Sequence, residues 1–493
     1  MDKLIDKIVR KITVDYCRLS IVGNQDGFLT RDDVRRLIYQ HSGIEVVAGS
    51  NLQLRIHYEL EYKSHPDARY IYVSQSIETL LADMRQSAYL IKFSISDLFP
   101  MFADKSLLRK QDYEVIDKLY EQVAQRRVTM GEGTFLIENV KHRIAEEKSK
   151  SCEHLLAQLQ RIDIDWNHAE KTIAALARII IQSIQNDCYD EIDEKLQSIN
   201  QNFQRWVDEH YFAMQNSNPQ LKAQCVNKIL PYLVANHSLE DRVALVVVDG
   251  LAYWQYAILR NYLQQQGIRA EEKITFSWLP SITMLSRQAI FRGTYPSQDY
   301  KQSPENERKL WMQYWQKQGF TSFEMQYLSD KDEFAINEGV KRLAYVTVEM
   351  DEKMHSSTDY KDLCSLTENW CPRLTEKIKT LLRLDYTIYL TTDHGNVLSH
   401  GWRKLSAVEK VFLYKDGSRG KRHLIYNNKV EQDSFFEKNK AKIPLLQHED
   451  WLAVRNDACF ENEGQTIITH GGSHFMEMVI PFVKIERNPR IWK

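Results

Sequence analysis

Carboxylate and imidazole side chains recur at the ends of apolar segments in the second half of this chain. Asp249 closes the run Val-Ala-Leu-Val-Val-Val, and Asp393 and His394 follow a second apolar segment at 386–392. Such runs predict buried parallel strands, whose carboxyl ends meet at the sheet edge where α/β proteins bind ligands. Further residues of suitable type follow at Thr283, Asp351, His355 and His470. Mixed carboxylate and imidazole ligands suit zinc or manganese, so the sequence predicts a metal site.

The number of these residues suits a pair of ions. Two metal ions a few ångströms apart need about seven protein ligands. We expect one ion to be held by Asp249, Thr283, Asp393 and His394, and the other by Asp351, His355 and His470. Asp351 and His355 are four residues apart, so a helical turn would place them on one face. Zn²⁺ is the favoured ion, with Mn²⁺ or Mg²⁺ as alternatives.

Neighbouring residues offer alternatives to some of these ligands. Glu349 or Glu352 can replace Asp351, and His474 competes with His470. His400 is interpreted as a loop histidine rather than a ligand.

The whole pattern resembles the alkaline phosphatase superfamily and, within it, the PglZ-domain proteins. The resemblance covers roughly residues 240–485. It is carried by Val-Asp249-Gly250, Pro280-Ser-Ile-Thr283, Gly293-Thr-Tyr-Pro296, Asp351-x-x-x-His355, Thr-Asp393-His394-Gly395, and His470-Gly-Gly with Glu477 and Pro481. The regions before residue 240 also look like the amino-terminal portions of PglZ proteins from BREX phage-defence systems.

The resemblance implies that a metal-bound Thr or Ser is the nucleophile of a phosphohydrolase. Thr283 aligns best, with Ser281 and Ser286 as alternatives. Arg287 lies one helical turn beyond Thr283, where it can bind a phosphate oxygen or pair structurally. No residue matches the additional phosphate-binding arginine of secreted monoesterases, which argues against efficient monoester hydrolysis.

A basic segment follows the predicted metal ligands. Residues 403–442 contain eleven Lys or Arg and five Asp or Glu. A substrate-binding rim for a phosphodiester, centred on Arg419, Lys421 and Arg422, is one interpretation; a solvated surface loop is the other.

The elements that must position these residues fall into three predicted parts. They are an amino-terminal α/β module at 1–100, a helical region at 101–238 and a catalytic domain at 239–493. In the first part the segments Leu52–Tyr58, Arg69–Val73 and Ala88–Phe93 are predicted strands. After residue 240 strands and helices alternate, which predicts an alkaline-phosphatase-like, mostly parallel sheet flanked by helices.

Composition places the chain among globular proteins. The net charge is −2 and 43% of the residues are hydrophobic. We expect a cytoplasmic protein without a membrane partner, since neither a signal peptide nor a membrane-length apolar run is found. Seven scattered cysteines without a Cys-x-x-Cys motif predict neither a disulfide framework nor a thiolate zinc site.

These observations favour a divalent-metal-dependent phosphohydrolase. Among such enzymes, we expect a phosphodiesterase or nuclease that acts on nucleic acid or nucleotides. We also expect a role in phage defence. A phosphomonoesterase or phosphotransferase is the alternative enzyme. A scaffold subunit of a defence complex is the non-enzymatic alternative. Residues 1–238 would contact other defence-system proteins.

Overall fold

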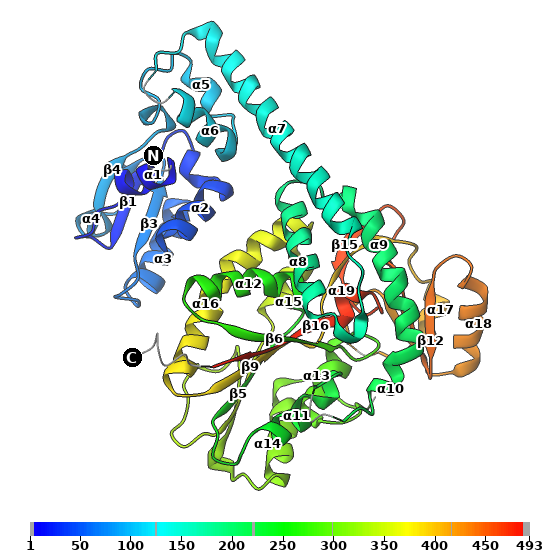
Figure 1. The fold of residues 1–493 in the computed structure, drawn as a ribbon. Helices are drawn as coiled ribbons and strands as arrows, with labels where there is room; N and C mark the ends of the chain where they lie inside the picture. Colours follow the sequence, from blue (N-terminus) through cyan, green and yellow to red (C-terminus); the bar gives the residue numbers. More distant parts are fainter. Residues whose placement is uncertain (1–3, 124–125, 219–221, 298, 416, 487–493) are drawn as a thin grey trace. The chain divides into compact units, whose positions relative to one another are not determined.

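The computed structural model of the chain describes residues 4–123, 126–218, 222–297, 299–415 and 417–486 (Figure 1). It divides into two units, Met1–Lys150 and Ser151–Lys493. This division lies inside the predicted helical region, and the three-part description by residues 1–100, 101–238 and 239–493 stays a prediction. No helix among the described residues is long and apolar enough to cross a membrane.

The first unit is built on a parallel four-stranded sheet in the order β2-β3-β1-β4. The strands are β1 (Leu19–Gly23), β2 (Glu45–Ala48), β3 (Tyr70–Ser74) and β4 (Tyr89–Lys92). The helices are α1 (Leu4–Ile12), α2 (Asp32–Ser42), α3 (Asn51–His57), α4 (Ala82–Gln86), α5 (Lys105–Leu108), α6 (Tyr113–Val123) and the long α7 (Met130–Gln160), which continues into the second unit. The predicted strands at 69–73 and 88–93 are confirmed as β3 and β4.

The prediction of a strand at Leu52–Tyr58 is wrong, because this segment forms helix α3. Ser50 and Gln53 make a capping box, in which each side chain bonds the backbone N–H of the other residue. This local start signal stabilises a helix at its first turn. The alternation of Leu52, Leu54 and Ile56 is not a strand pattern, since only Leu54 is buried.

The second unit contains a six-stranded sheet in the order β6-β16-β9-β5-β8-β7. Its strands are β5 (Val243–Val248), β6 (Ala270–Phe276), β7 (Met325–Ser329), β8 (Arg342–Thr347), β9 (Thr387–Thr391) and β16 (Val479–Ile485). Neighbouring pairs among β9, β5, β8 and β7 are parallel, whereas β16 runs antiparallel to both β9 and β6. Every residue of β5 is buried, as expected for a central strand covered on both faces. The predicted mostly parallel sheet is confirmed.

Helices cover both faces of this sheet (Figure 1). They are α8 (Glu170–Gln185), α9 (Tyr189–Trp206), α10 (Phe212–Met214), α11 (Ile229–Asn236), α12 (Tyr253–Gln265), α13 (Thr283–Arg292), α14 (Pro304–Lys317), α15 (Glu349–Ser356), α16 (Tyr360–Arg383) and α19 (Phe475–Met478). Figure 1 shows α8, α12 and α16 on one side and α11, α13 and α14 on the other. Side chains of α8 and α9 share one hydrophobic core with the sheet, so these helices belong to the same unit as the site described below.

Two small sheets lie between β9 and β16 in the sequence. One contains β10 (Val397–Gly401), β14 (Ala458–Cys459) and β15 (Thr466–Thr469). The other contains β11 (His423–Ile425), β12 (Leu445–His448) and β13 (Trp451–Val454), accompanied by α17 (Ala407–Val411) and α18 (Lys429–Asn439). The basic segment therefore includes a structured subdomain rather than a single loop. One of its acids, Asp416, lies outside the described residues.

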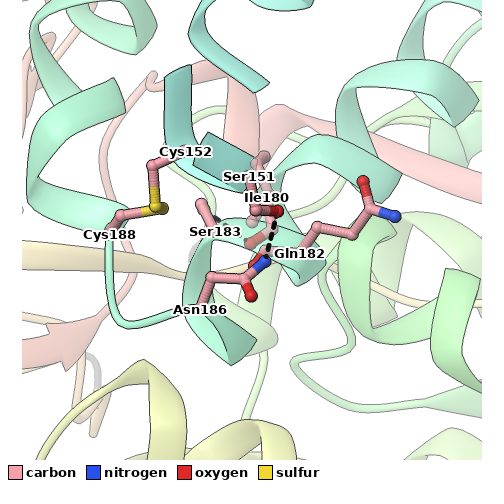
Figure 2. The surroundings of a disulfide bond; sticks show 7 residues. All are labelled: Ser151, Cys152, Ile180, Gln182, Ser183, Asn186 and Cys188. Carbon is pink, nitrogen blue, oxygen red and sulfur yellow. Dashed lines mark hydrogen bonds between the residues drawn. A yellow bond between two sulfur atoms is a disulfide. The ribbon is translucent and has the colours of Figure 1, made fainter. Parts of the chain in front are cut away.

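A disulfide joins Cys152 and Cys188 (Figure 2). The cysteine pattern predicts no disulfide framework, and it gives no indication of this individual pair. The two residues are 36 positions apart with α8 between them, so no short motif announces the bond. Packing brings them together: Cys152 lies near the end of α7 and Cys188 in the turn before α9, where the Asn186 side chain also donates to Ser151 Oγ at 3.2 Å.

Candidate active site

The predicted metal ligands gather at the carboxyl edge of the six-stranded sheet. Asp249 follows β5, Asp393 and His394 follow β9, and α15 after β8 carries Asp351 and His355. His470 directly follows β15, a strand of one of the two small sheets. Gly250 permits the approach, because it has a φ of +73° and a Cβ there would lie 3.2 Å from the backbone of Asp351.

Asp249, Asp393 and His394 form the first group of candidate ligands. The Nε2 atom of His394 lies 3.5 Å from both Asp249 Oδ1 and Asp393 Oδ2. The N–H groups of Gly250 and His394 donate to Asp393 Oδ1 at 3.1 and 3.0 Å. These bonds orient the carboxylate and leave Asp393 Oδ2 buried without a hydrogen-bond donor among the described residues. A buried carboxylate oxygen in this state is suited to a cation.

Asp351, His394 and His470 form the second group, and His355 adjoins it. Asp351 Oδ1 lies 3.3 Å from His355 Nε2 and 3.9 Å from His470 Nε2. Within the described part of the chain, Asp351 Oδ1 and His355 Nε2 have no hydrogen-bond partner although both are buried. The spacing of four residues on α15 thus brings Asp351 and His355 to one face, as the sequence indicates.

Contacts of Nδ1 with backbone carbonyls orient two imidazole rings so that their Nε2 atoms face the site. His470 Nδ1 lies 3.0 Å from the carbonyl of Ser281, and His394 Nδ1 lies 2.9 Å from the carbonyl of Gly395. Such contacts fix the tautomer of a metal-binding histidine and leave Nε2 for the ion. The two rings stack with centroids 3.9 Å apart, so His394 connects the two groups. His394 therefore belongs to both groups of candidate ligands.

The electrostatics of the site favour a bound cation. Burial raises the pKa of Asp249 well above its usual value, and the nearby charges of Asp393 and Asp351 raise it further. Burial opposes ionisation of Asp351 as well, but the adjacent imidazoles of His355, His470 and His394 hold its pKa below the usual value. Burial and the neighbouring His394 lower the pKa of His470, which keeps its imidazole neutral and able to bind a metal. The donor set and the unpartnered buried atoms therefore fit divalent ions.

Thr283 is the first residue of α13 and is partly accessible. Its Oγ1 lies 3.1 Å from His394 Nε2 and 3.4 Å from Asp249 Oδ1. The alternatives Ser281 and Ser286 are fully buried. Ser281 Oγ donates to the carbonyl of Gly472 at 2.8 Å, and Ser286 Oγ pairs with Ser277 Oγ at 3.0 Å. Of these hydroxyls, Thr283 alone combines partial exposure with contacts to the candidate ligands.

Arg287 does not reach toward a substrate. Its Nη1 donates to Asp249 Oδ2 at 2.8 Å, while Nε and Nη2 donate to Glu307 at 2.7 and 2.5 Å. The guanidinium is 3% exposed and Glu307 is fully buried. Every nitrogen of the guanidinium is engaged by a carboxylate, so of the two roles open to Arg287 the structure favours structural pairing over contact with a phosphate oxygen. Sequence reasoning missed Glu307, which lies 20 residues away in α14 without a motif.

The three basic residues of the predicted rim separate in the structure. Arg419 pairs with Asp351, and 55% of its side chain is exposed. Lys421 lies 3.8 Å from Glu461 with its side chain about half exposed. Arg422 is fully buried against Glu477, with Nε 3.0 Å from Oε1, so its assignment to the rim is wrong. Glu477 also accepts from the N–H of Gly472, so this pair supports the turn that carries His470.

The remaining alternatives occupy other roles. Glu349 pairs with Arg373 at 2.6 Å, and Glu352 is exposed. His474 is buried and its Nδ1 accepts from the N–H of Met476 at the start of α19. His400 is exposed beside Asp457.

One protein-family model matches the part of the chain that contains these residues. A sequence model of the BREX system PglZ alkaline phosphatase-like domain matches residues 227–485, more than half of the chain. No curated protein matches.

Solved structures with partial similarity include two hydrolases. Murine ectonucleotide pyrophosphatase/phosphodiesterase 5 is 12% identical, with 50% of this chain and 88% of that one covered and a TM-score of 0.35. Phosphonoacetate hydrolase from Sinorhizobium meliloti 1021, in complex with phosphonoacetate, is 12% identical, with 51% and 91% covered and a TM-score of 0.35.

Proposed function

The chain belongs to the family of BREX PglZ alkaline phosphatase-like domains, and on that premise we propose that it is a divalent-metal-dependent phosphohydrolase that cleaves phosphodiesters of nucleic acid or nucleotides. One observation carries the proposal. Two groups of buried carboxylates and imidazoles, sharing His394, lie beside the partly accessible hydroxyl of Thr283.

The residues present can hold two ions. Asp249, Asp393, His394 and Thr283 would bind one ion, and Asp351, His355 and His470 the other; Zn²⁺ is favoured over Mn²⁺ and Mg²⁺. When bound, such ions lower the pKa of a coordinated hydroxyl and neutralise charge on a phosphoryl group. The orphaned oxygens of Asp393 and Asp351 support this assignment.

Thr283 is the proposed nucleophile. Its oxygen would form a bond to phosphorus as one ester oxygen departs as an alcohol, which takes up the proton lost from the threonine hydroxyl; water would then release the remaining monoester from threonine and restore the hydroxyl. Its place at the start of the ten-residue helix α13 adds the positive end of the helix dipole, which favours negative charge on the substrate. Arg287 and Glu307 hold Asp249 in position from behind this helix terminus.

Arg419 is the proposed substrate contact. It is half exposed and pairs with Asp351, so its guanidinium lies at the edge of the site where a phosphate would bind. Guanidinium groups bind phosphate oxygens bidentately. With Arg287 and Arg422 both engaged in buried ion pairs, few cations are left for a dianionic monoester, which supports a diester. Lys421 would contribute a second charge along a longer polyanion.

The biological setting belongs to the same proposal. Membership of the PglZ family supports a role in phage defence, in the cytoplasm, with other defence-system proteins bound through residues 1–238.

A pair of threonine substitutions tests the mechanism. Thr283→Ala should lower hydrolysis of bis-nitrophenyl phosphate by several orders of magnitude and keep most of the bound metal, measured by elemental analysis. The control Thr380→Ala, at a half-buried position of α16, should keep the wild-type rate. A wild-type rate in Thr283→Ala would remove Thr283 from the mechanism. Faster hydrolysis of nitrophenyl phosphate than of the diester, without binding to labelled DNA or RNA, would favour the monoesterase alternative.

A further inference from the structure

A cavity of about 840 Å³ lies in the first unit, far along the sequence from the metal ligands. It is lined by the segments that follow β1, β2 and β3, and thus sits at the carboxyl edge of the parallel sheet. In the order β2-β3-β1-β4, the chain leaves β1 toward β2 and leaves β3 toward β4. The two connections run in opposite directions across the sheet, each passing over the other's strand, so right-handed crossovers place them on opposite faces next to β1 and β3. Open parallel sheets bind ligands at such a switch point.

The loop after β1 is held in one conformation by buried hydrogen bonds. Asn24 is 1% exposed, accepts from the N–H of Leu29 at 2.9 Å and donates to the carbonyl of Phe93 at 2.9 Å. Asp26 accepts from Asn24 Nδ2 at 2.6 Å and from the N–H of Ile95 at 2.7 Å. Donors of the protein itself thus bind the carboxylate of Asp26. The same hydrogen bonds fix this part of the cavity wall before any ligand binds.

The groups that line the cavity define the chemistry of a ligand. Gln25 and Gln75 follow β1 and β3, and their side chains make no hydrogen bond to the described residues. Arg35 supplies a cation; its Nε donates to the carbonyl of Val46, and its Nη1 lies 3.4 Å from the exposed carboxylate of Asp32. Apolar lining is limited to small aliphatic side chains, and several serine and threonine hydroxyls complete the wall.

We propose that this cavity binds a nucleoside monophosphate. A carboxamide donates and accepts at once, which matches the paired donor and acceptor on the edge of a nucleobase. The Arg35 guanidinium suits a phosphate, and the hydroxyls suit a ribose. The volume lies within the range of about 300–1,000 Å³ typical of small-molecule sites. This site would be separate from the proposed phosphohydrolase site, so the two can be tested independently.

Calorimetric titration of the full-length protein in EDTA tests the proposal, since the chelator prevents metal-dependent hydrolysis. AMP, GMP, CMP and UMP are titrated separately, with ribose 5-phosphate as the comparison ligand. At least one mononucleotide should bind one to one, and at least tenfold more tightly than ribose 5-phosphate. Gln25→Ala/Gln75→Ala should weaken that binding by about tenfold or more, whereas the exposed Gln122→Ala in α6 should leave it unchanged.

Two results would overturn the assignment. One is equal affinity in the double variant and the wild type, with both showing the same thermal melting. The other is failure of all four mononucleotides to bind more tightly than ribose 5-phosphate. Diester hydrolysis by the metal-loaded double variant should match the wild type, so failure of the nucleotide site and failure of the proposed phosphohydrolase function give different results.

Discussion

Substitution of Arg287 by Met distinguishes a positioning residue from a phosphate ligand. Arg287 contacts Asp249 and Glu307, and the side chains of all three are at most 4% exposed. Met keeps most of the volume but removes the charge, leaving two buried carboxylates without their cation. Removal of one partner from a buried ion pair costs about 3–5 kcal/mol. We therefore expect Arg287→Met to lower the free energy of unfolding of the metal-free protein by about this amount.

Bound metal should restore part of the loss in Arg287→Met. A cation beside Asp249 compensates that carboxylate, although Glu307 remains unpaired. The double variant Arg287→Met/Glu307→Gln also removes the charge of Glu307 and leaves only Asp249 unpaired, so it should lose less stability than the single variant. The assay is urea denaturation with and without added Zn²⁺.

The control for this prediction is Arg308→Met. Arg308 pairs with Asp332 at 3.2 Å, but the side chains are 44% and 32% exposed. Exposed pairs contribute about 0–1 kcal/mol, so this variant should differ little from the wild type. If Arg287→Met unfolds like Arg308→Met but raises the KM for the diester tenfold or more, Arg287 is a phosphate ligand and the positioning role is refuted.

Three further predictions concern the second unit. Cys152→Ser should lower the free energy of unfolding under oxidising conditions by about 4 kcal/mol, the entropic contribution of a 36-residue loop closed with Cys188, and a reducing agent should remove the difference from wild type. Burial and the carboxylates of Asp393 and Asp351 raise the pKa of Asp249, so proton release from this group destabilises the folded metal-free protein as pH rises above the usual carboxyl range; the increase in melting temperature caused by Zn²⁺ should therefore grow with pH. Arg419→Ala should raise the KM for bis-nitrophenyl phosphate, whereas Lys421→Ala should leave it unchanged and weaken oligonucleotide binding alone, as measured by initial rates and fluorescence anisotropy.

Residue types and their order were sufficient to indicate the sheet edge and the carboxylates and imidazoles that gather there. Asp249 after an apolar strand and the Asp393-His394 pair after another are local patterns, and parallel strands bring such positions together. The shared position of His394 was not predictable, because it depends on ring stacking against His470 from a different sheet.

Long-range pairing explains the errors. Arg422 and Lys421 are adjacent in sequence, yet only Arg422 turns inward. It does so because it pairs with the buried Glu477 of α19, which lies 55 residues further along the chain. Glu307 and Cys188 likewise take their roles from tertiary packing. In α3, the capping box at Ser50 stabilises a helix although apolar and polar residues alternate as they would in a strand. Charge and spacing in the sequence do not reveal the long-range pairs, whereas the capping box of Ser50 and Gln53 is a local signal that the sequence does contain.

The central claim is metal-dependent diester hydrolysis, and its most direct test is the initial rate with bis-nitrophenyl phosphate before and after chelation. The purified protein loaded with Zn²⁺ should hydrolyse the diester, lose the activity on chelation, and regain it when Zn²⁺ or Mn²⁺ is added back. An unchanged rate after verified removal of all bound metal would contradict the account. So would the absence of hydrolysis of both the diester and the monoester with Zn²⁺, Mn²⁺ and Mg²⁺ each present.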